Sequence, residues 1–282
     1  MTRRLTVWMC AAAIGLAAAV CPGVEKGPSA AETRPEPKNP IKGYTNTPLV
    51  PGTTWHIHDP NRPQPKYVQP KYDGKPVPSP AGATVLFDGT SLDKWRNKKW
   101  KLVDGAMQVT KGGQQSVASF GDMHLHVEWL VPKGLKGYCQ KQGNSGVYMM
   151  CKYEIQVLNC YDNRTYPDGM TAAMYGQYPP RVNACRKPGQ WQSFDIHFKA
   201  PVFKDGKLVS GAYVTVYHNN VLVHDNRMYM GPSVWRKVAQ YKPHAAKAPI
   251  SLQAHGSPVK YRNIWVAPLT RTLGPDAPKS GK

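Results

Sequence analysis

Residues 142–159 have the sequence QGNSGVYMMCKYEIQVLN, and this stretch decides the fold. It contains a turn rich in Gly and Asn, a short apolar strand, a tight Cys151-Lys152 connection and a second strand. In the second strand, apolar residues at 153, 155 and 157 alternate with Glu154 and Gln156. Successive side chains of a strand point to opposite faces, so a carboxyl and an amide share one face. We interpret that face as the floor of a polar cleft.

The chain from residue 83 onward repeats this pattern in short alternating segments separated by Gly, Asn, Asp and Pro turns. Asp104-Gly105 and Asn219-Asn220 are typical of two-residue hairpin turns. Further strands are expected at residues 122–129, 192–198, 250–255 and 259–266. No amphipathic helix of ten or more residues is predicted, apart from a short piece around residues 234–241. The pattern predicts an all-β fold, an antiparallel sandwich or barrel.

The 282-residue chain has a formal net charge of +20 and a pI near 9.7. Such a charge is compatible with a surface protein that binds a polyanion. However, Lys and Arg are dispersed among Pro, Gly and Tyr, without a dense basic run or an RNA-binding aromatic motif. We therefore expect no nucleic-acid partner.

The N-terminus indicates export. Arg3 and Arg4 precede an apolar run over residues 7–20, which is typical of a signal peptide and too short for a membrane span. We assign residues 1–30 to this signal, with cleavage after Ala19 or near Ala30, and expect a periplasmic or extracellular protein. Cys21 leaves a lipid anchor open as an alternative.

Export would place four cysteines, Cys139, Cys151, Cys160 and Cys185, where disulfides persist. Four cysteines allow three pairings, and the sequence does not choose among them. None of their spacings is that of a zinc site.

Residues 31–82 are rich in proline, which disfavours helices and central strands. To about residue 40 they resemble a disordered linker. Beyond it, aromatic and apolar residues predict an extended arm that lies on the main domain with Trp55 as its anchor, the alternative being a mobile tail. The domain itself is assigned to residues 83–269, with a tail over 270–282.

The penultimate strand presents Gln253 and His255 on one face, and the last strand offers Arg262 and Asn263. Two distant strands thus each present a Gln beside an ionisable group. Amides and guanidinium groups suit a sugar, whose hydroxyls need oriented polar partners.

Five motifs, in order along residues 83–269, carry a resemblance to a known family. They are LFDG at 86–89 with Leu92 and Trp95, GNSGVY at 143–148, YEIQVL at 153–158, GQW at 189–191, and LQAHG at 252–256 with YRNI at 261–264. Together they resemble the 3-keto-disaccharide hydrolase family, also described as 3-keto-glucoside 1,2-lyase/hydratase domains. The resemblance implies a concanavalin- or laminarinase-like jelly-roll β-sandwich. Ala254 departs from the polar residue expected there.

The resemblance also implies a reaction. A ketone at C3 of a glucoside acidifies the C2 proton, a base removes it, the C1 substituent leaves, and water adds back. An upstream sugar 3-dehydrogenase would supply this substrate. Ordinary glycosidases instead need two carboxylates that flank the bond. The strand of Glu154 carries no second carboxylate at i+2 or i+4, which favours the keto-sugar route.

The candidate catalytic residues are Glu154 and His255, one as base and one as acid. The candidate substrate-binding residues are Asn144, Gln156, Gln253 and Arg262 for hydroxyls and the oxyanion, and Tyr175 and Trp191 for stacking on the sugar ring. A divalent metal held by Glu154 and His255 is a further hypothesis.

Each assignment has a structural alternative. Arg262 would form an ion pair with Glu154, and His255 would hydrogen-bond the backbone of its turn. Asn144 would be a turn residue that tolerates positive φ, and Trp191 would belong to the core. His124, His126 and His197 are interpreted as solvated or cross-strand residues. For the whole protein, the alternative is a non-catalytic sugar-binding module, because one fold hosts both functions.

Overall fold

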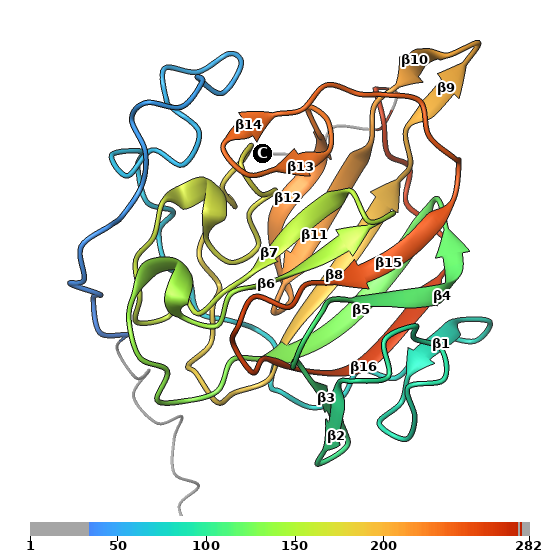
Figure 1. Ribbon diagram of the computed structural model, residues 1–282, viewed down its shortest axis with the longest axis horizontal. Helices are drawn as coiled ribbons and strands as arrows, with labels where there is room; N and C mark the ends of the chain where they lie inside the picture. Colours follow the sequence, from blue (N-terminus) through green and yellow to red (C-terminus); the bar gives the residue numbers. More distant parts are fainter. Residues whose placement is uncertain (1–33, 276, 278–282) are drawn as a thin grey trace, which may run out of the picture. The chain divides into compact units, whose positions relative to one another are not determined.

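Residues 142–159 contain a hairpin of two strands, β6 (Ser145–Met149) and β7 (Tyr153–Val157). The computed structural model describes residues 34–275 and residue 277, and from Pro35 onward these residues form one compact unit (Figure 1). The hairpin belongs to a four-stranded sheet of order β4-β15-β6-β7. Its other strands are β4 (Gln114–Phe120) and β15 (Ala248–Leu252).

The second sheet has eight strands in the order β12-β11-β8-β5-β16-β3-β2, with β1 paired to β16. Their bounds are β1 (Thr84–Phe87), β2 (Lys101–Val103), β3 (Ala106–Gln108), β5 (Met123–Leu130), β8 (Gln192–Lys199), β11 (Tyr213–His218), β12 (Val221–Met228) and β16 (Lys260–Ala267). The strands of both sheets pair antiparallel. The all-β sandwich architecture is therefore confirmed.

Four shorter strands and two single-turn 3-10 helices complete the described secondary structure. They are β9 (Val202–Lys204) with β10 (Lys207–Ser210), β13 (Ser233–Val234) with β14 (Lys237–Val238), η1 (Cys139–Lys141) and η2 (Pro167–Gly169). The short helix expected around residues 234–241 is wrong, because that segment forms the β13–β14 hairpin. Among the residues that the structure describes, no helix has the length and apolar character needed to cross a membrane.

The predicted hairpin turns are confirmed. Asp104 and Gly105 have φ of 52° and 68°, and Asn219 and Asn220 have φ of 51° and 62°. Two consecutive residues with positive φ match the twist of the flanking strands, and Asn, Asp and Gly tolerate this conformation best. In the β6–β7 turn the corresponding pair is Met150 and Cys151.

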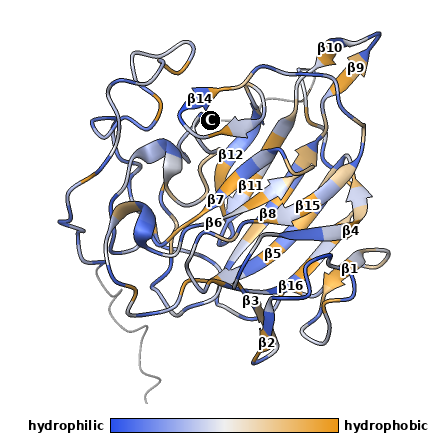
Figure 2. Ribbon diagram, viewed as in Figure 1, coloured by the Kyte–Doolittle hydropathy of each residue, from blue (hydrophilic) through white to orange (hydrophobic). Residues whose placement is uncertain are grey.

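The core lies between the two sheets and takes one face from each. Leu125, Val127 and Trp129 of β5 are fully buried there, as are Val147 of β6 and Ile155 of β7. Figure 2 shows the alternation of hydrophobic and hydrophilic residues along the strands of the large sheet. Because of this alternation, one face of each strand packs in the core, and the other face carries polar side chains that are available for binding or catalysis.

The arm over residues 35–82, blue to cyan in Figure 1, packs against the rest of the unit. Its buried residues include Val50, Ile57 and His58, each with no exposed surface, and Tyr72. Trp55, the expected anchor, is only half-buried. Backbone hydrogen bonds hold the arm against the rest of the unit, among them the one from Tyr72 N–H to Asn219 O at 3.1 Å.

Two further predictions concern the N-terminal signal peptide and the four cysteines. The predicted signal peptide lies within residues 1–33, outside the described residues. Of the cysteines, Cys139 is buried and accepts a hydrogen bond from the Lys42 N–H at 3.2 Å, and the Cys151 thiol donates to Pro249 O at 3.3 Å. Cys160 and Cys185 are buried in one small cluster, against which Tyr67 of the arm packs, and the Cys160 N–H donates to Cys185 Sγ at 3.4 Å.

Candidate functional site

A cavity of about 940 Å³ opens beside β6 and β7. Its walls come from five parts of the chain: the arm, the loop that contains η1, the segment between β7 and β8, the β13–β14 hairpin, and the segment that follows β15. Six of the eight predicted site residues line it, namely Asn144, Glu154, Gln156, Tyr175, Gln253 and His255. The structure thus brings the two polar segments that the sequence singled out to one cavity.

Glu154 lies on β7 and is 2% exposed. Its backbone N–H donates to Ser233 Oγ at 3.0 Å, and its carbonyl accepts from the Tyr229 hydroxyl at 3.0 Å. Burial raises the pKa of the carboxyl to about 8, although a hydrogen bond from Tyr148 acts in the opposite direction. A carboxyl with a pKa near neutrality is suited to proton transfer.

Gly146 makes room for this carboxyl. It faces Gln156 across the β6–β7 pair, and a Cβ at position 146 would collide with Glu154 Oε1 and lie 2.9 Å from the Tyr148 ring. Any larger residue would therefore displace the carboxyl or the tyrosine. Tyr148 is itself opposite Glu154 across the pair, which positions its hydroxyl for the hydrogen bond.

Amide side chains line the same cavity as the Glu154 carboxyl. Gln140 Oε1 accepts hydrogen bonds from Asn144 Nδ2 at 2.8 Å and from Gln156 Nε2 at 3.1 Å. Gln156 Nε2 also lies 3.3 Å from Gly169 O, so both of its N–H groups have partners. Gln156 Oε1 is buried and has none within the described residues. An oriented acceptor without a partner is available to a ligand hydroxyl.

Gln253 and His255 follow β15, which ends at Leu252, so the predicted strand over residues 250–255 stops earlier than expected. The backbone still pairs once more, through the Gln253 N–H and Gly146 O at 2.9 Å. Gln253 Nε2 donates to the Tyr148 hydroxyl at 3.2 Å, and its Oε1 is a second buried acceptor without a partner in the described chain. His255 is exposed at the mouth of the cavity.

Tyr175 belongs to an aromatic wall. Its hydroxyl lies 3.4 Å from that of Tyr166, and both rings pack on the buried His58 of the arm, with centroids 4.9 and 4.4 Å away. His58 Nδ1 lies 3.4 Å from Asp168 Oδ2. The arm therefore supports the ring that the sequence nominated for sugar stacking.

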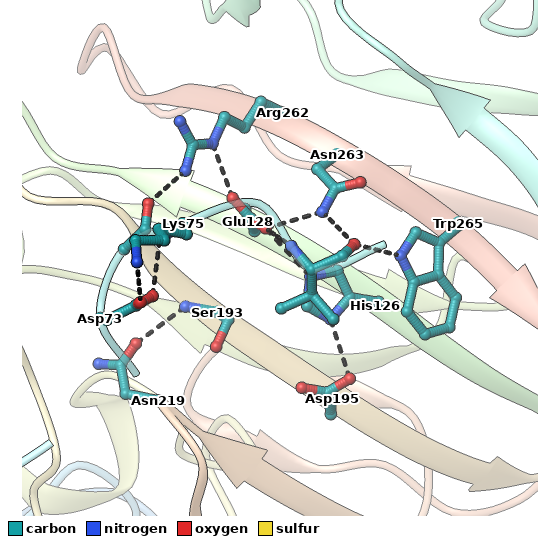
Figure 3. A network of polar contacts seen from close by, with 12 residues as sticks. Asp73, Lys75, His126, Glu128, Ser193, Asp195, Asn219, Arg262, Asn263 and Trp265 are labelled. Atoms are coloured by element: carbon teal, nitrogen blue, oxygen red, sulfur yellow. Dashed lines mark hydrogen bonds and ion pairs between the residues drawn. The ribbon is translucent and has the colours of Figure 1, made fainter. Parts of the chain in front are cut away.

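Trp191 and Arg262 are not brought to this cavity. Arg262 Cζ lies 4.1 Å above the Trp191 ring, and its Nε bonds Glu128 Oε2 at 2.6 Å, so its ionic partner is Glu128 and not Glu154. Arg262 and Glu128 belong to a network on the outer face of the large sheet, covered by the arm (Figure 3).

This outer network also contains the histidines that were interpreted as solvated or cross-strand residues, and His126 among them is fully buried. His126 Nδ1 lies 2.9 Å from Asp195 Oδ1 and its Nε2 lies 3.4 Å from Glu128 Oε1. Burial would lower the pKa of His126, but the two carboxylates together raise it to about 9. His124 shares Asp195 at 3.1 Å and stacks on His197 at 4.1 Å.

Sequence reasoning missed several lining residues: Gln140, Tyr148, Tyr166, Tyr44 and Trp235. Tyr148 had a signal, since it stands two residues from Gly146 on the face opposite to Val147 and Met149. The others lie in loops and in the arm, where no periodicity marks the direction of a side chain.

The metal hypothesis finds limited support in the residues. Glu154 and His255 both line the cavity, but no group of three or more His, Cys, Asp or Glu that could hold a metal ion occurs among residues 34–275. The other oxygen-bearing side chains that line the cavity are neutral amides and hydroxyls, among them Gln156 and Gln253, whose amide oxygens have no partner in the described chain. This set lacks the several carboxylates typical of a divalent cation site and therefore does not fit such an ion.

Known structures and families were compared with this chain. A structure from Parabacteroides distasonis ATCC 8503, described as a "putative glycosyl hydrolase", is 39% identical, with a TM-score of 0.67 over 73% of this chain and 93% of that chain. A second structure from this organism with the same description is 21% identical, with a TM-score of 0.50 over 66% and 99% of the two chains, and it shows the fold alone. No curated protein matched. Residues 82–267 match the family described as 3-keto-alpha-glucoside-1,2-lyase-like domain. This chain therefore belongs to the 3-keto-alpha-glucoside-1,2-lyase-like family, as its five motifs predicted.

Proposed function

We propose that this protein cleaves 3-keto-glycosides by removal of the C2 proton, 1,2-elimination of the C1 substituent and addition of water. One observation carries the proposal. Among the described residues that line the cavity, Glu154 is the only carboxylic acid, and it is buried with a pKa raised to about 8. A glycosidase that acts directly on the bond needs a second carboxylate about 5–10 Å away. Elimination needs a single base with a suitable pKa.

In this reaction Glu154 takes the proton from C2, and the C2–H electrons form the enolate of the C3 ketone. The enolate then collapses, the C1–O bond breaks with its electron pair on the leaving oxygen, and a C1–C2 double bond remains. His255, at the mouth, donates a proton to the leaving oxygen. Water then adds its hydroxyl to C1 and its proton to C2, which gives net hydrolysis.

The neighbouring side chains orient the sugar. Tyr148 remains protonated, because burial and the nearby Glu154 raise its pKa, and its hydroxyl serves as a donor to the carboxylate. The partnerless oxygens of Gln156 and Gln253 accept hydrogen bonds from sugar hydroxyls. Tyr175 offers its ring to the sugar, and Asn144 holds the Gln140–Gln156 amide chain in place.

Three further parts of the proposal rest on sequence and resemblance. The sandwich is of the concanavalin- or laminarinase-like jelly-roll type. The protein is exported, as residues 1–30 predict, to the periplasm or the exterior. A dehydrogenase that oxidises C3 of a glycoside precedes it in the reaction sequence, since the substrate must already carry the ketone.

The test compares a 3-keto-glucoside with its unoxidised parent and with the same substrate deuterated at C2. We expect aglycone release from the keto form alone, with a primary isotope effect on kcat/KM. Equal turnover of the parent glycoside would exclude the elimination route. Tight binding without turnover of either compound would support the sugar-binding module instead.

A further inference from the structure

A second pocket, of about 540 Å³, adjoins the cavity that Glu154 lines. Tyr148 and Gln253 line both hollows, so the two meet at these side chains. The second pocket lies over the strands β6, β15 and β4 of the small sheet and over the segment before β2, which supplies Arg96. The carboxyl assigned to the reaction lines only the first cavity, so the second pocket has no part in the chemistry proposed above.

One row of side chains crosses the small sheet from the cavity to the second pocket. The strand registers place Glu154 of β7 opposite Tyr148 of β6, and Tyr148 opposite Ser251 of β15. Ser251 is in turn opposite Gln115 of β4. Directly opposite residues of neighbouring strands point to the same face of a sheet. Leu252, which alternates with Ser251, is buried in the core, so the row lies on the outward face.

Arg96 extends this row beyond β4. Its backbone N–H donates to Gln115 O at 2.9 Å, and its neighbour Trp95 forms a β-bridge with Ser116, so the segment pairs with the edge of the sheet. Trp95 is fully buried, and its indole N–H donates to a carbonyl of β1 at 3.0 Å, which fixes the segment. Arg96, the next residue, is exposed. The four interstrand steps from Glu154 to Arg96, about 4.8 Å each, add up to about 19 Å along the sheet.

This end of the row is positively charged. Among the described residues that line the second pocket, Arg96 alone is charged, and no carboxylate of the described chain forms an ion pair with it. The segment around it, KWRNKKWK at residues 94–101, contains five cations and no carboxylate. All five cations are exposed, whereas both tryptophans are buried in the core. The cations form no continuous run, but together they create a local positive potential.

The chemistry of the pocket fits an acidic saccharide. A guanidinium without an ionic partner can bind a carboxylate or a similar oxyanion through two parallel hydrogen bonds. The rest of the lining offers amides and hydroxyls, which suit sugar hydroxyls. Single-stranded nucleic acids depend on exposed aromatic rings for base stacking, and both tryptophans of the segment are buried. The pocket therefore favours an acidic sugar chain over a nucleic acid.

We propose that the row from Glu154 to Arg96 is a binding track for an acidic oligosaccharide, in which a carboxylate or sulfate group pairs with Arg96 while one end of the chain occupies the Glu154 cavity. This inference rests on the proposed function for the reaction at that end. The length of the row places the anion beyond the immediate neighbour of the reacting ring. The track thus determines which saccharide is bound and not which bond is cleaved.

The test is calorimetric titration of the wild-type protein and of Arg96→Gln with three oligosaccharides of equal length: an oligogalacturonate, a sulfated oligosaccharide and a neutral cello-oligosaccharide. We expect an acidic oligosaccharide to bind more tightly than the neutral one, and Arg96→Gln to weaken its binding about 5- to 20-fold. Lys99→Gln is the matched control, because it removes the same charge from an exposed residue of the same segment that lines neither hollow. Its binding of the acidic oligosaccharide should stay within about twofold of the wild type.

Arg96-dependent binding of either acidic oligosaccharide would support the track, and the tighter of the two identifies the anion. Equal weakening in Arg96→Gln and Lys99→Gln would show a diffuse attraction and overturn the track. Neutral binding as tight as acidic binding would overturn it too. A single-stranded DNA oligonucleotide is a fourth titrant, and Arg96-dependent binding of DNA that is tighter than that of both acidic oligosaccharides would assign the surface to nucleic acid.

These titrations need no turnover, so they separate the track from the reaction. Arg96-dependent binding of an acidic oligosaccharide by a protein that cleaves no 3-keto-glycoside would retain the track and remove the proposed reaction. Cleavage of 3-keto-glycosides without such binding would retain the reaction and overturn the track.

Discussion

Two buried glutamates in this molecule have similar sequence settings, but the pKa values of their carboxyl groups are shifted in opposite directions. Glu128 on β5 and Glu154 on β7 each stand on the polar face of an alternating strand, and each is almost completely buried. Burial would raise the pKa of Glu128, but hydrogen bonds from His126, Asn263, the Val77 N–H and Arg262 together lower it to about 2. Burial raises the pKa of Glu154 to about 8, against the hydrogen bond from Tyr148 alone.

The two pKa shifts differ because the two carboxyl groups have different numbers of hydrogen-bond donors around them. The arm and β16 bring donors to Glu128 and satisfy its oxygens at 2.6 to 2.9 Å. The polar residues around Glu154 instead bond to one another and leave the acceptors of Gln156 and Gln253 open. A buried carboxylate whose oxygens all accept hydrogen bonds has a structural role. A carboxyl with few hydrogen-bond donors beside a cavity is available for proton transfer.

Replacement of Glu154 should have the largest effect. We expect Glu154→Gln to reduce kcat for a 3-keto-glucoside by at least about 10³-fold, because the amide is isosteric with the carboxyl and cannot accept the C2 proton. Circular dichroism and the melting curve should remain those of a folded protein. Glu128→Gln is the control, and activity retained in Glu154→Gln would remove this residue from the mechanism.

Glu128→Gln should instead reduce stability. The substitution leaves Arg262 without its anionic partner and leaves His126 with Asp195 alone, which costs about 3–5 kcal/mol of unfolding free energy. Urea denaturation at pH 7 measures this loss. Below the unfolding transition, kcat per folded molecule should match the wild type, and a selective loss of kcat would place the outer network in the catalytic path.

Gly146→Ala should affect both properties moderately. The added methyl collides with Glu154 Oε1 and crowds Tyr148, so we expect a loss of about 1–3 kcal/mol in stability and about 10²-fold in kcat. The same substitution in a Glu154→Ala background should cost less stability, because the methyl then has room. An equal cost in both backgrounds would show that the methyl acts on something other than the carboxyl.

Much of the fold was predictable because it depends on local chemistry. Alternation placed Leu125, Val127 and Trp129 in the core, and Asp104-Gly105 and Asn219-Asn220 turned the hairpins as expected. Of the family motifs, GNSGVY and YEIQVL fall largely on β6 and β7. These features depend on neighbouring residues, and strand periodicity reports them directly.

The site was only partly predictable, since it depends on which distant segments meet. Gln156 and Gln253 reach one cavity through the β15–β6–β7 pairing, and alternation alone showed that both point away from the core. Arg262 obeys the same alternation but faces the opposite side of the sandwich, toward Glu128. Tyr44 and Trp235 come from an arm and a hairpin tip, whose placement follows from tertiary contacts that no local pattern encodes.

The smallest predicted effect is also the sharpest contrast between the two glutamates, because they should respond to pH in opposite directions. The pKa of Glu154 is raised from 4.5 to about 8, so the folded state holds this proton more tightly, and its ionisation penalty grows between pH 4.5 and 8. Glu154→Gln should therefore stabilise the protein at pH 8, by about 1–3 kcal/mol, and have little effect at pH 4.

The pKa of Glu128 is lowered from 4.5 to about 2, so the stabilisation that its carboxylate provides is present above pH 4.5 and disappears as pH falls toward 2. The cost of Glu128→Gln should shrink over that range. Denaturation curves of both variants between pH 2 and 8 measure the two windows, and parallel pH dependences would mean that Glu154 is as well partnered as Glu128.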